Sequence, residues 1–292
     1  HAGIRSGALP PARPRQTMHY SATMLATAPS SPPLAQPPAL LLAAGRGERM
    51  RPLTDTCPKP LLPVRGKPLL RWHSDALAAS GFTQQLINAG WLHEQIASYI
   101  SEHFGSFEPS NLPEQLSKDK CQGQRLVALS DEAADFGEAL ETLGGIARAL
   151  PQLADVFWVV AGDIYAPAFS FSQADYAAFA ASPALAHVFL VPNPEHNSRG
   201  DFCINADGQL RVIDAMPQGA ETYTFSTIAL YKRAFFAQPE CGIAAGNPQG
   251  VAAPLAPLLR HAASQNLISA SVYQGAWMDV GTPERLAALN AA

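Results

Sequence analysis

The sequence predicts an α/β fold: a Rossmann-like, doubly wound and mostly parallel sheet with helices on both faces and a small antiparallel subregion. Two observations predict it. Short apolar runs alternate with helical patterns after Pro38, as in a chain of β-α units. The apolar runs are continuous, which is typical of strands buried on both faces of a parallel sheet. Right-handed crossovers between such strands build a doubly wound sheet.

The apolar run at 39–44, A-L-L-L-A-A, is the first expected strand, and glycines follow it closely. The run at 156–161, V-F-W-V-V-A, has the strongest strand pattern in the chain. Further strands are expected at 85–89, 125–130 and 186–191. The apolar spacing that indicates helices occurs at 69–80, 93–104, 140–150, 173–181, 252–265 and 283–291.

The pattern changes after Pro192. Segments at 202–205, 210–215 and 223–231, the first two separated by an A-D-G turn at 206–208, predict antiparallel strands. These strands form the expected antiparallel subregion. The polar stretch at 105–124 shows no periodicity and is interpreted as a surface insertion.

The first 37 residues differ in composition from the rest of the chain. Residues 1–38 contain eight prolines, three arginines and no acidic residue, a composition that cannot build a packed core. We therefore expect a disordered extension at 1–37 and one folded domain at 38–292. Met18 and Met24 offer other starts, so an artefactual start of the chain is one alternative, and an organelle transit peptide is another.

Composition excludes several functions. The net charge of −4 becomes −7 when the three arginines of 1–37 are set aside, which argues against nucleic acid or an anionic membrane as a partner. The four cysteines have no metal-ligand spacing, so a reducing cytoplasm fits best and zinc chemistry is not expected. No apolar stretch is long enough to span a bilayer.

The segment 42–54, L-A-A-G-R-G-E-R-M-R-P-L-T, follows the first strand. Glycines at 45 and 47 let the backbone turn tightly, and free N–H groups in such a loop bind anions, phosphate above all. Arg46, Arg49 and Arg51 add guanidinium groups beside it. The spacing fits neither the dinucleotide fingerprint nor the P-loop. Read in isolation, the segment is also compatible with an ordinary tight turn.

Lys59 stands in K-P-L-L-P-V, where two prolines restrict the backbone; a solvated surface lysine is the alternative. With this second motif the chain resembles the sugar-1-phosphate nucleotidyltransferases, whose signature is L-A-A-G-x-G-x-R followed by K-P-L-x-P-V. The resemblance continues in E-T-L-G-G-I at 141–146, G-D-I at 162–164 and W-M-D-V-G-T at 277–282.

Within this family the chain resembles the branch that transfers uridylyl to N-acetylmuramate α-1-phosphate in bacterial cell-wall recycling. The motifs are N-A-G-W-L at 88–92, R-G-D-F at 199–202, T-F-S at 224–226 and L-A-P-L-L-R at 255–260. The resemblance implies a nucleoside triphosphate, UTP above all, and a sugar 1-phosphate as partners. Mannose 1-phosphate with GTP, glucose 1-phosphate with dTTP, and a non-catalytic subunit that binds nucleotide sugars are the alternatives.

The resemblance also implies residue roles. Catalysis would fall to Arg49, Lys59, Asp163 and Asp279. The nucleotide would be bound by Leu42, Ala43, Ala44, Gly45, Gly47, Arg49, Lys59, Asn88 and Gly144. The sugar would be bound by Glu141, Asn193, Arg199 and Gly200. Asp163 and Asp279 would hold Mg²⁺, since each follows an apolar run that would end at the carboxyl edge of a sheet. Turn or cap residues are the alternative reading of these two aspartates.

Three residues depart from the family pattern. Leu143 stands where the relatives have a glycine, in a segment expected beside the nucleotide, which leaves base preference open. Tyr165 replaces a frequent Trp, and Thr227 replaces a frequent Gly.

N-acetylmuramate carries a lactyl ether that ends in a carboxylate, so a selective site should offer a cation. Arg199 is the only Lys or Arg within 193–202, with His196 beside it. We therefore expect Arg199 to bind that carboxylate. The alternative is that Arg199 pairs with Asp201 or Glu195 and shapes the loop.

Overall fold

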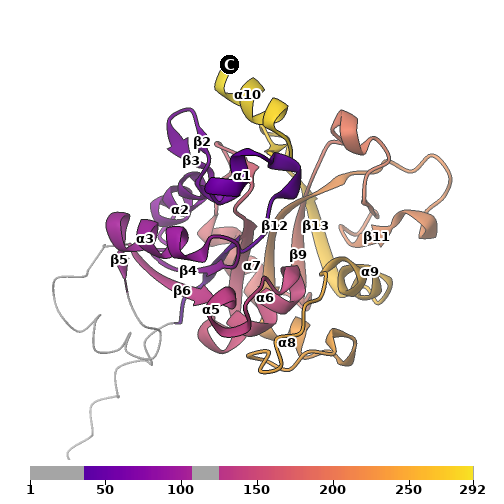
Figure 1. Cartoon of the computed structure of the whole chain (residues 1–292). Helices are drawn as coiled ribbons and strands as arrows, with labels where there is room; N and C mark the ends of the chain where they lie inside the picture. Colours follow the sequence, from indigo (N-terminus) through magenta and orange to yellow (C-terminus); the bar gives the residue numbers. More distant parts are fainter. Residues whose placement is uncertain (1–35, 107–124, 292) are drawn as a thin grey trace, which may run out of the picture. The chain divides into compact units, whose positions relative to one another are not determined.

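A computed structural model describes residues 36–106 and 125–291, so the expectations for 1–35 and most of 105–124 fall outside the described residues. The described residues are built on an eight-stranded sheet (Figure 1). Its strand order is β13-β9-β12-β7-β1-β4-β6-β5. The strands are β1 (Ala39–Ala43), β4 (Gln84–Ala89), β5 (Gly105–Ser106), β6 (Leu126–Asp131), β7 (Val156–Ala161), β9 (Ala186–Val191), β12 (Thr224–Lys232) and β13 (Ile268–Val272).

All neighbouring strands in this sheet are parallel except at β12, which runs antiparallel to both β7 and β9. The mostly parallel α/β sheet expected from the sequence is therefore confirmed. The placement of 223–231 in a separate subregion is wrong, because β12 lies inside the main sheet. Burial explains this position, since Ile228, Ala229 and Leu230 are almost fully buried between the two neighbouring strands.

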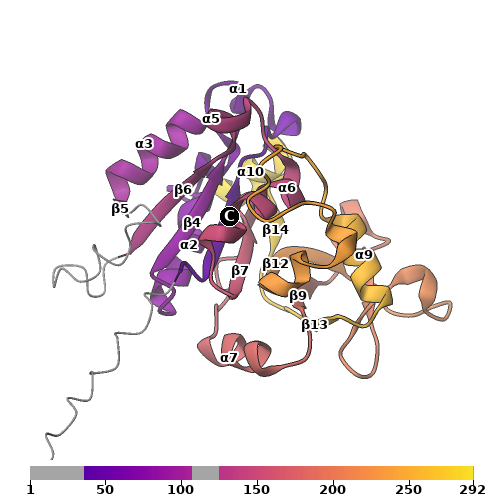
Figure 2. The same cartoon turned by 90° about the horizontal axis from the view of Figure 1, so that it is seen from below.

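Helices cover both faces of the sheet. Leu70 and Leu77 of α2 and Ile96 of α3 pack in the apolar cluster on one face, whereas Ile146 of α6 and Leu258 of α9 pack on the other. Figure 2 shows α3 and α9 on opposite sides of the sheet. The helices are α1 (Leu53–Thr56), α2 (Leu69–Ala79), α3 (His93–His103), α5 (Glu132–Phe136), α6 (Glu141–Ala149), α7 (Gln173–Ala181), α8 (Arg233–Phe236), α9 (Ala256–Ser264) and α10 (Pro283–Ala291).

Three two-stranded sheets complete the fold. The hairpin of β10 (Phe202–Ile204) and β11 (Leu210–Val212) is the part of the expected antiparallel subregion that stands apart from the main sheet. The hairpin of β2 (Pro63–Val64) and β3 (Lys67–Pro68) begins with the last two residues of the lysine motif. The third pairs β8 (Ile164–Tyr165) with β14 (Met278–Asp279).

A third apolar cluster joins these small sheets to the glycine-rich loop. Met50 after the loop, Val64 in β2, Tyr165 in β8 and Val280 after β14 all pack in it, with Leu286 of α10. Each of these residues is buried. Segments far apart in the sequence are therefore held beside the carboxyl end of β1 by one common core. Figure 1 shows α10 next to β2 and β3, in agreement with this packing.

The start of the folded unit is fixed by hydrogen bonds. Gln36 donates to the carbonyl of Pro151, and the carbonyl of Pro37 accepts from Ala154 N. Contacts with the domain thus begin slightly before residue 38. Within the described residues, no helix combines the length and the apolar character needed to cross a membrane.

Candidate active site

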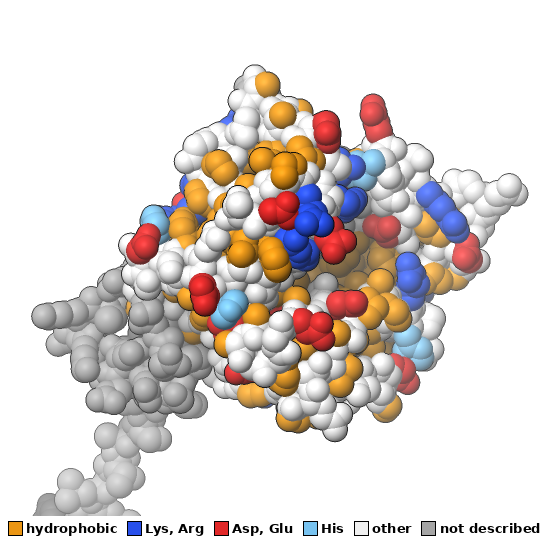
Figure 3. Space-filling model, viewed as in Figure 1, with side chains coloured by type: hydrophobic (Ala, Val, Ile, Leu, Met, Phe, Trp, Pro, Cys, Tyr) orange, Lys and Arg blue, Asp and Glu red, His pale blue; other side chains and the backbone are white. Residues whose placement is uncertain are grey.

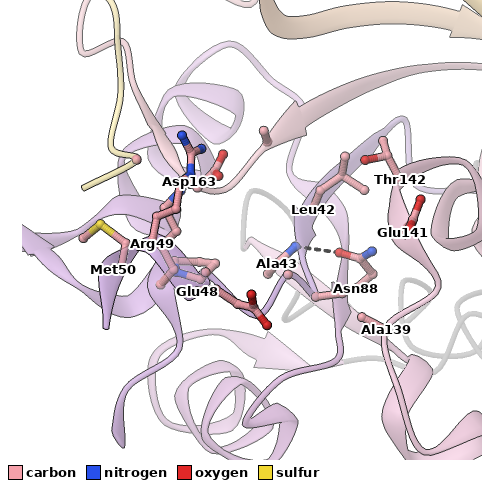
Figure 4. Close-up of a pocket in the computed structure, with 17 residues that line it drawn as sticks. Leu42, Ala43, Glu48, Arg49, Met50, Asn88, Ala139, Glu141, Thr142 and Asp163 are labelled. Atoms are coloured by element: carbon pink, nitrogen blue, oxygen red, sulfur yellow. Dashed lines mark hydrogen bonds and ion pairs between the residues drawn. The ribbon is translucent and has the colours of Figure 1, made fainter. Parts of the chain in front are cut away.

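A cavity of about 490 Å³ opens at the carboxyl end of β1. The register places Asn88 of β4 and Ala161 of β7 on either side of Leu42, so the loops after these three strands meet at one edge of the sheet. Open α/β sheets bind ligands at such an edge. In Figure 4, Arg49 and Asp163 lie on one side of the cavity and Asn88 and Thr142 on the other.

Most residues expected to bind the nucleotide line this cavity. They are Leu42, Ala43, Ala44, Gly45, Gly47, Arg49, Lys59 and Asn88. Asp163 and Glu141 line it as well. The space-filling view shows a hollow in this face with Lys, Arg, Asp and Glu side chains gathered at its border (Figure 3).

Glycine stands at positions 45 and 47 for two different structural reasons. Gly47 has φ +64°, and a Cβ there would lie 3.2 Å from carbons of Thr54 and Lys59. Any other residue would be strained at this position. A Cβ on Gly45 would meet nothing within 4 Å. Gly45 therefore leaves space in the cavity open for a ligand, whereas Gly47 allows the loop to fold.

The three arginines near the loop do not act together. Arg46 stacks on the Trp91 ring at 3.4 Å and forms an ion pair with Asp55, which Arg51 also contacts at 2.8 Å. Arg49 alone among the three lines the cavity. The sequence predicts three guanidinium groups beside the anion-binding loop, but of these three arginines only Arg49 is placed to bind an anion in the cavity. The other two stabilise the loop through their contacts with Asp55.

Asn88 reaches the cavity from β4 and is held on both sides of its amide. Its Oδ1 accepts a hydrogen bond from Ala43 N at 2.6 Å, and its Nδ2 donates to Glu132 Oε1 at 2.7 Å. Glu132 is fully buried, and its other oxygen accepts from Leu140 N. Burial raises the pKa of the Glu132 carboxyl. This network ties the first strand to the start of α6.

Lys59 and Asp163 form an ion pair of 2.6 Å at the rim of the cavity. Lys59 is largely buried, whereas the Asp163 side chain is 43% exposed. The exposure of the carboxylate leaves it accessible to a ligand, and the lysine fixes its position. The K-P-L-L-P-V motif thus places Lys59 against Asp163, two residues after the end of β7. The sequence alone does not establish this contact.

Pairing of β14 with β8 brings Asp279 close to Asp163. Asp279 lies opposite Ile164, and Val280 N donates to the carbonyl of Asp163 at 3.0 Å. Asp279 Oδ1 accepts from Arg285 Nη1 at 2.6 Å and lies 2.9 Å from His196 Nε2. The pairing of β8 with β14 therefore brings together two aspartates that are far apart in the sequence.

Sequence reasoning did not assign roles to Arg285 and Glu132, and it named His196 only as a neighbour of Arg199. Arg285 stands six residues after Asp279, at the start of α10, a position that carries no local signal until β14 and α10 are placed. Glu132 follows the third strand of the predicted series, where an acidic residue also suits a helix start.

Of the residues expected to bind the sugar, Asn193 and Gly200 have structural roles in a loop, whereas Arg199 lies on the surface. Asn193 donates to Thr222 at 2.9 Å and packs against Gly200, whose φ is +72°. Both residues organise the loop before β10, and neither lines the cavity at the end of β1 or the adjoining cavity bordered by Phe202 and Tyr231. Arg199 is 77% exposed and lies 3.4 Å from Asp214. It pairs with neither Asp201 nor Glu195 within the described residues.

Residues of E-T-L-G-G-I lie within α6 rather than in a loop. Leu143 is buried in the core and does not line the cavity. The expectation that its side chain lies beside the nucleotide is therefore wrong. Gly144 is also buried, and a Cβ there would lie 2.3 Å from the carbonyl of Val251. Gly144 therefore serves close packing in this structure, and it does not line the cavity.

Tyr165 and Thr227 also have structural explanations. Tyr165 is buried in the third cluster, edge-on to Trp72 at 5.3 Å. Thr227 has φ +63° at a bulge in β12, between Phe225 and Ile228. A glycine would adopt this conformation without strain.

The fold and this cavity are those of an α/β protein with room for an anionic ligand at the carboxyl edge of its sheet. The nucleotidyl transferase family model matches residues 38–292, and the chain belongs to this family. It is 42% identical over 255 residues, 85% of this chain and 94% of the relative, to the N-acetylmuramate alpha-1-phosphate uridylyltransferase of Neisseria meningitidis serogroup B.

A second relative of the same name, from Caulobacter vibrioides, is 30% identical and is covered to 95%, with 87% of this chain aligned. Among solved structures, the inositol-1-phosphate CTP transferase from T. maritima superposes with a TM-score of 0.57. Identity there is 14%, over 88% of this chain and 96% of that chain. This structural likeness supports the fold.

Proposed function

We propose that this nucleotidyltransferase moves a uridylyl group from UTP to N-acetylmuramate α-1-phosphate and releases pyrophosphate. The observation that carries the proposal is the meeting of the glycine-rich loop, Arg49, Lys59 and Asp163 around one cavity. Asp279 is not among the residues that line this cavity, but the pairing of β14 with β8 places it beside Asp163. The choice of UTP and of this sugar is supported by the two relatives that carry this activity in their names.

The two aspartates fit a divalent cation by the chemistry of their donors. No hydrogen-bond partner within the described residues engages Asp163 Oδ1 or Asp279 Oδ2, and carboxylate oxygens are the hard ligands that Mg²⁺ prefers. Asp163 and Asp279 would hold the ion together with substrate phosphates and water. When bound, magnesium supplies charge neutralisation at the triphosphate.

The reaction does not need a dedicated general base. A phosphate monoester has a second pKa of about 6, so the sugar 1-phosphate is mostly dianionic at neutral pH. One of its oxygens forms a bond to the α-phosphorus while the bond to the bridging oxygen breaks, and pyrophosphate leaves in line. Arg49 and Lys59 offer their positive charges to the phosphates, so alignment and charge neutralisation carry the catalysis.

A substrate panel tests the proposal. Purified protein is incubated with Mg²⁺, each of four nucleoside triphosphates and several sugar 1-phosphates, and pyrophosphate release is measured. We expect the highest kcat/KM with UTP and N-acetylmuramate 1-phosphate, and loss of activity when the metal is chelated. A preference for GTP with mannose 1-phosphate, or dTTP with glucose 1-phosphate, would keep the chemistry and reject the substrates. Nucleotide-sugar binding without turnover would favour a non-catalytic subunit.

A further inference from the structure

A second cavity of about 350 Å³ adjoins the first. Leu42, Thr142 and Ala161 line both cavities, so a molecule in the second lies next to the nucleotide site. Val159 and Ala229 of the main sheet form part of its wall. The position suits the acceptor substrate, which must approach the triphosphate from an adjoining space.

The wall of the second cavity is mostly apolar, with a few polar groups. Phe202, Phe225 and Leu259 contribute apolar surface. Tyr231 also lines it, and its buried hydroxyl has no hydrogen-bond partner within the described residues. Ligand sites commonly combine such apolar walls with a few placed polar groups. An unsatisfied hydroxyl here offers a hydrogen bond to a neutral polar group of a ligand.

Arg260 is the one Lys or Arg among the described residues that line this second cavity. It follows Leu259 in α9 and stands four residues after Ala256, and all three line the cavity, as expected for one helical face. Within the parts of the chain that the structure describes, Arg260 has no ion-pair or hydrogen-bond partner. Its guanidinium is therefore available to an anionic ligand.

The acidic residue of the same cavity does not neutralise Arg260. Asp201 Oδ2 accepts from Phe225 N at 2.9 Å, and its Oδ1 accepts from Asn197 Nδ2 at 3.2 Å. Asp201 thus anchors the loop, and it forms no ion pair with Arg260. Among the described residues that line this cavity, Arg260 is the one Lys or Arg, and its charge is not paired. Figure 3 shows basic side chains on both sides of the hollow.

We propose that Arg260, rather than Arg199, binds the lactyl carboxylate of N-acetylmuramate 1-phosphate and so determines sugar specificity. The proposal rests on the proposed function. Arg199 lines neither cavity and lies beside Asp214 on the surface, whereas Arg260 borders the space next to the nucleotide. A guanidinium binds a carboxylate with two parallel hydrogen bonds, which an unsubstituted sugar hydroxyl cannot reproduce.

The test compares two acceptors that differ only in the lactyl group. Arg260→Met keeps most of the apolar stem and removes the charge. We expect kcat/KM for N-acetylmuramate 1-phosphate to fall about 10- to 150-fold, the range for a hydrogen bond to a charged group. The kcat/KM for N-acetylglucosamine 1-phosphate should change less than about threefold. Arg260→Lys should retain part of the discrimination.

Two matched arginine variants sharpen the comparison. Arg199→Met tests the other candidate, and the ratio of the two kcat/KM values should stay as in the wild type. Arg233→Met, at a half-buried arginine beside Asp155 that lines neither cavity, measures the general effect of removing a guanidinium. Melting temperatures of all variants show whether each one folds.

Each outcome has one meaning. Equal losses on both acceptors in Arg260→Met would assign Arg260 to the phosphate or the fold, and a changed ratio in Arg199→Met alone would restore Arg199; both overturn the inference. If the wild type prefers another sugar 1-phosphate, the proposed function fails and the inference fails with it. A wild type that prefers N-acetylmuramate 1-phosphate, together with an Arg260→Met variant that keeps the wild-type preference, isolates failure of the inference.

Discussion

Lys59, Arg285 and His196 hold the two carboxylates of the site from three different segments. Lys59 Nζ contacts Asp163 at 2.6 Å, and Arg285 contacts Asp279 at the same distance. Lys59 and Arg285 position the aspartates and leave one oxygen of each without a partner in the described chain. Under the proposed function, each aspartate would both bind a metal ion and form a structural ion pair. A neutral amide at either position tests this double role.

Asp163→Asn and Asp279→Asn should each reduce kcat by about 10³-fold or more, since loss of a magnesium ligand forfeits several kcal/mol of charge stabilisation. Because both ion pairs are partly exposed, the fold should survive. Steady-state kinetics and thermal melts of both variants check this. A variant that melts normally and keeps more than about a tenth of the wild-type rate would remove that aspartate from the list of metal ligands.

The loop residues of the site were within reach of the sequence, because a contiguous motif places them. Gly45, Gly47 and Arg49 follow β1 directly, and all three line the cavity. Arg199 and Arg260 were not distinguishable in this way, since the two arginines lie far apart in the chain and only the packing of α9 against the sheet decides which one borders a cavity.

At the scale of single elements, β12 contains a departure from regular geometry. Ser226 Oγ accepts from Ile228 N and donates to the carbonyl of Phe189, which fixes the bulge. The bulge forces Thr227 to φ +63°. A β-branched residue in this region is rare and strained, so Thr227 destabilises β12 locally, beside the second cavity.

Thr227→Gly should raise the free energy of unfolding by about 0.5–1 kcal/mol, because relief of a left-handed conformation outweighs the greater freedom of glycine in the unfolded chain. Thr227→Ala is the control, since it keeps a Cβ in the same region and should bring no gain. Urea denaturation of the three proteins compares them. Equal or lower stability of the glycine variant would show that the bulge is not strained.

His73 of α2 supports the strand that follows Asp163. It is almost completely buried, and its Nε2 lies 2.8 Å from the carbonyl of Ile164. Burial lowers the pKa of His73, so the folded chain keeps this ring neutral. The unfolded chain takes up the proton below about pH 6.5, and the contribution of His73 therefore destabilises the fold as the pH falls.

His73→Gln keeps a donor for the carbonyl and removes the titration. Between pH 7.5 and 5.5 the wild type should lose up to about 1.4 kcal/mol more unfolding free energy than the variant, the value for a group that takes up a proton at about pH 6.5 in the unfolded chain and stays neutral in the folded chain. Urea denaturation at both pH values measures the difference. The same loss in the two proteins would mean that His73 does not account for the pH dependence.

Element types were well predicted where periodicity and burial agree. The spans 156–161, 173–181 and 186–191 coincide with β7, α7 and β9. β13 was missed, since I-S-A-S-V alternates apolar and small polar residues and follows a helix without a clear turn. The central position of β12 also escaped, because its neighbours β7 and β9 are chosen by tertiary packing rather than by adjacent hairpins.

At the scale of the whole molecule, the described residues form one main sheet with an apolar core on each face, and a third apolar cluster joins three small sheets to the site. The doubly wound arrangement follows from the order of strands and helices, which the sequence displays. Strand order within the sheet does not follow from it, because β7, β12 and β9 are neighbours in an order that the chain does not visit consecutively.

The composition of 1–37 motivates a prediction about truncation. We expect deletion of 1–33 to leave melting temperature and turnover unchanged, since a Pro-rich segment without acidic residues builds no core. Deletion of 1–37 is the matched comparison, and it should lower the melting temperature by a few degrees because the bonds of Gln36 and Pro37 are lost. A drop of more than roughly 5 °C in the shorter truncation would show that the extension stabilises the domain.

The most direct test of the whole account is a competition experiment on the full chain. Equal amounts of UTP, GTP, CTP and dTTP are mixed with Mg²⁺ and equal amounts of N-acetylmuramate, N-acetylglucosamine, mannose and glucose 1-phosphates, and the products are identified by mass spectrometry at low conversion. We expect UDP-N-acetylmuramate as the dominant product. A different nucleotide sugar as the main product, or none at all from protein that melts cooperatively, would contradict it.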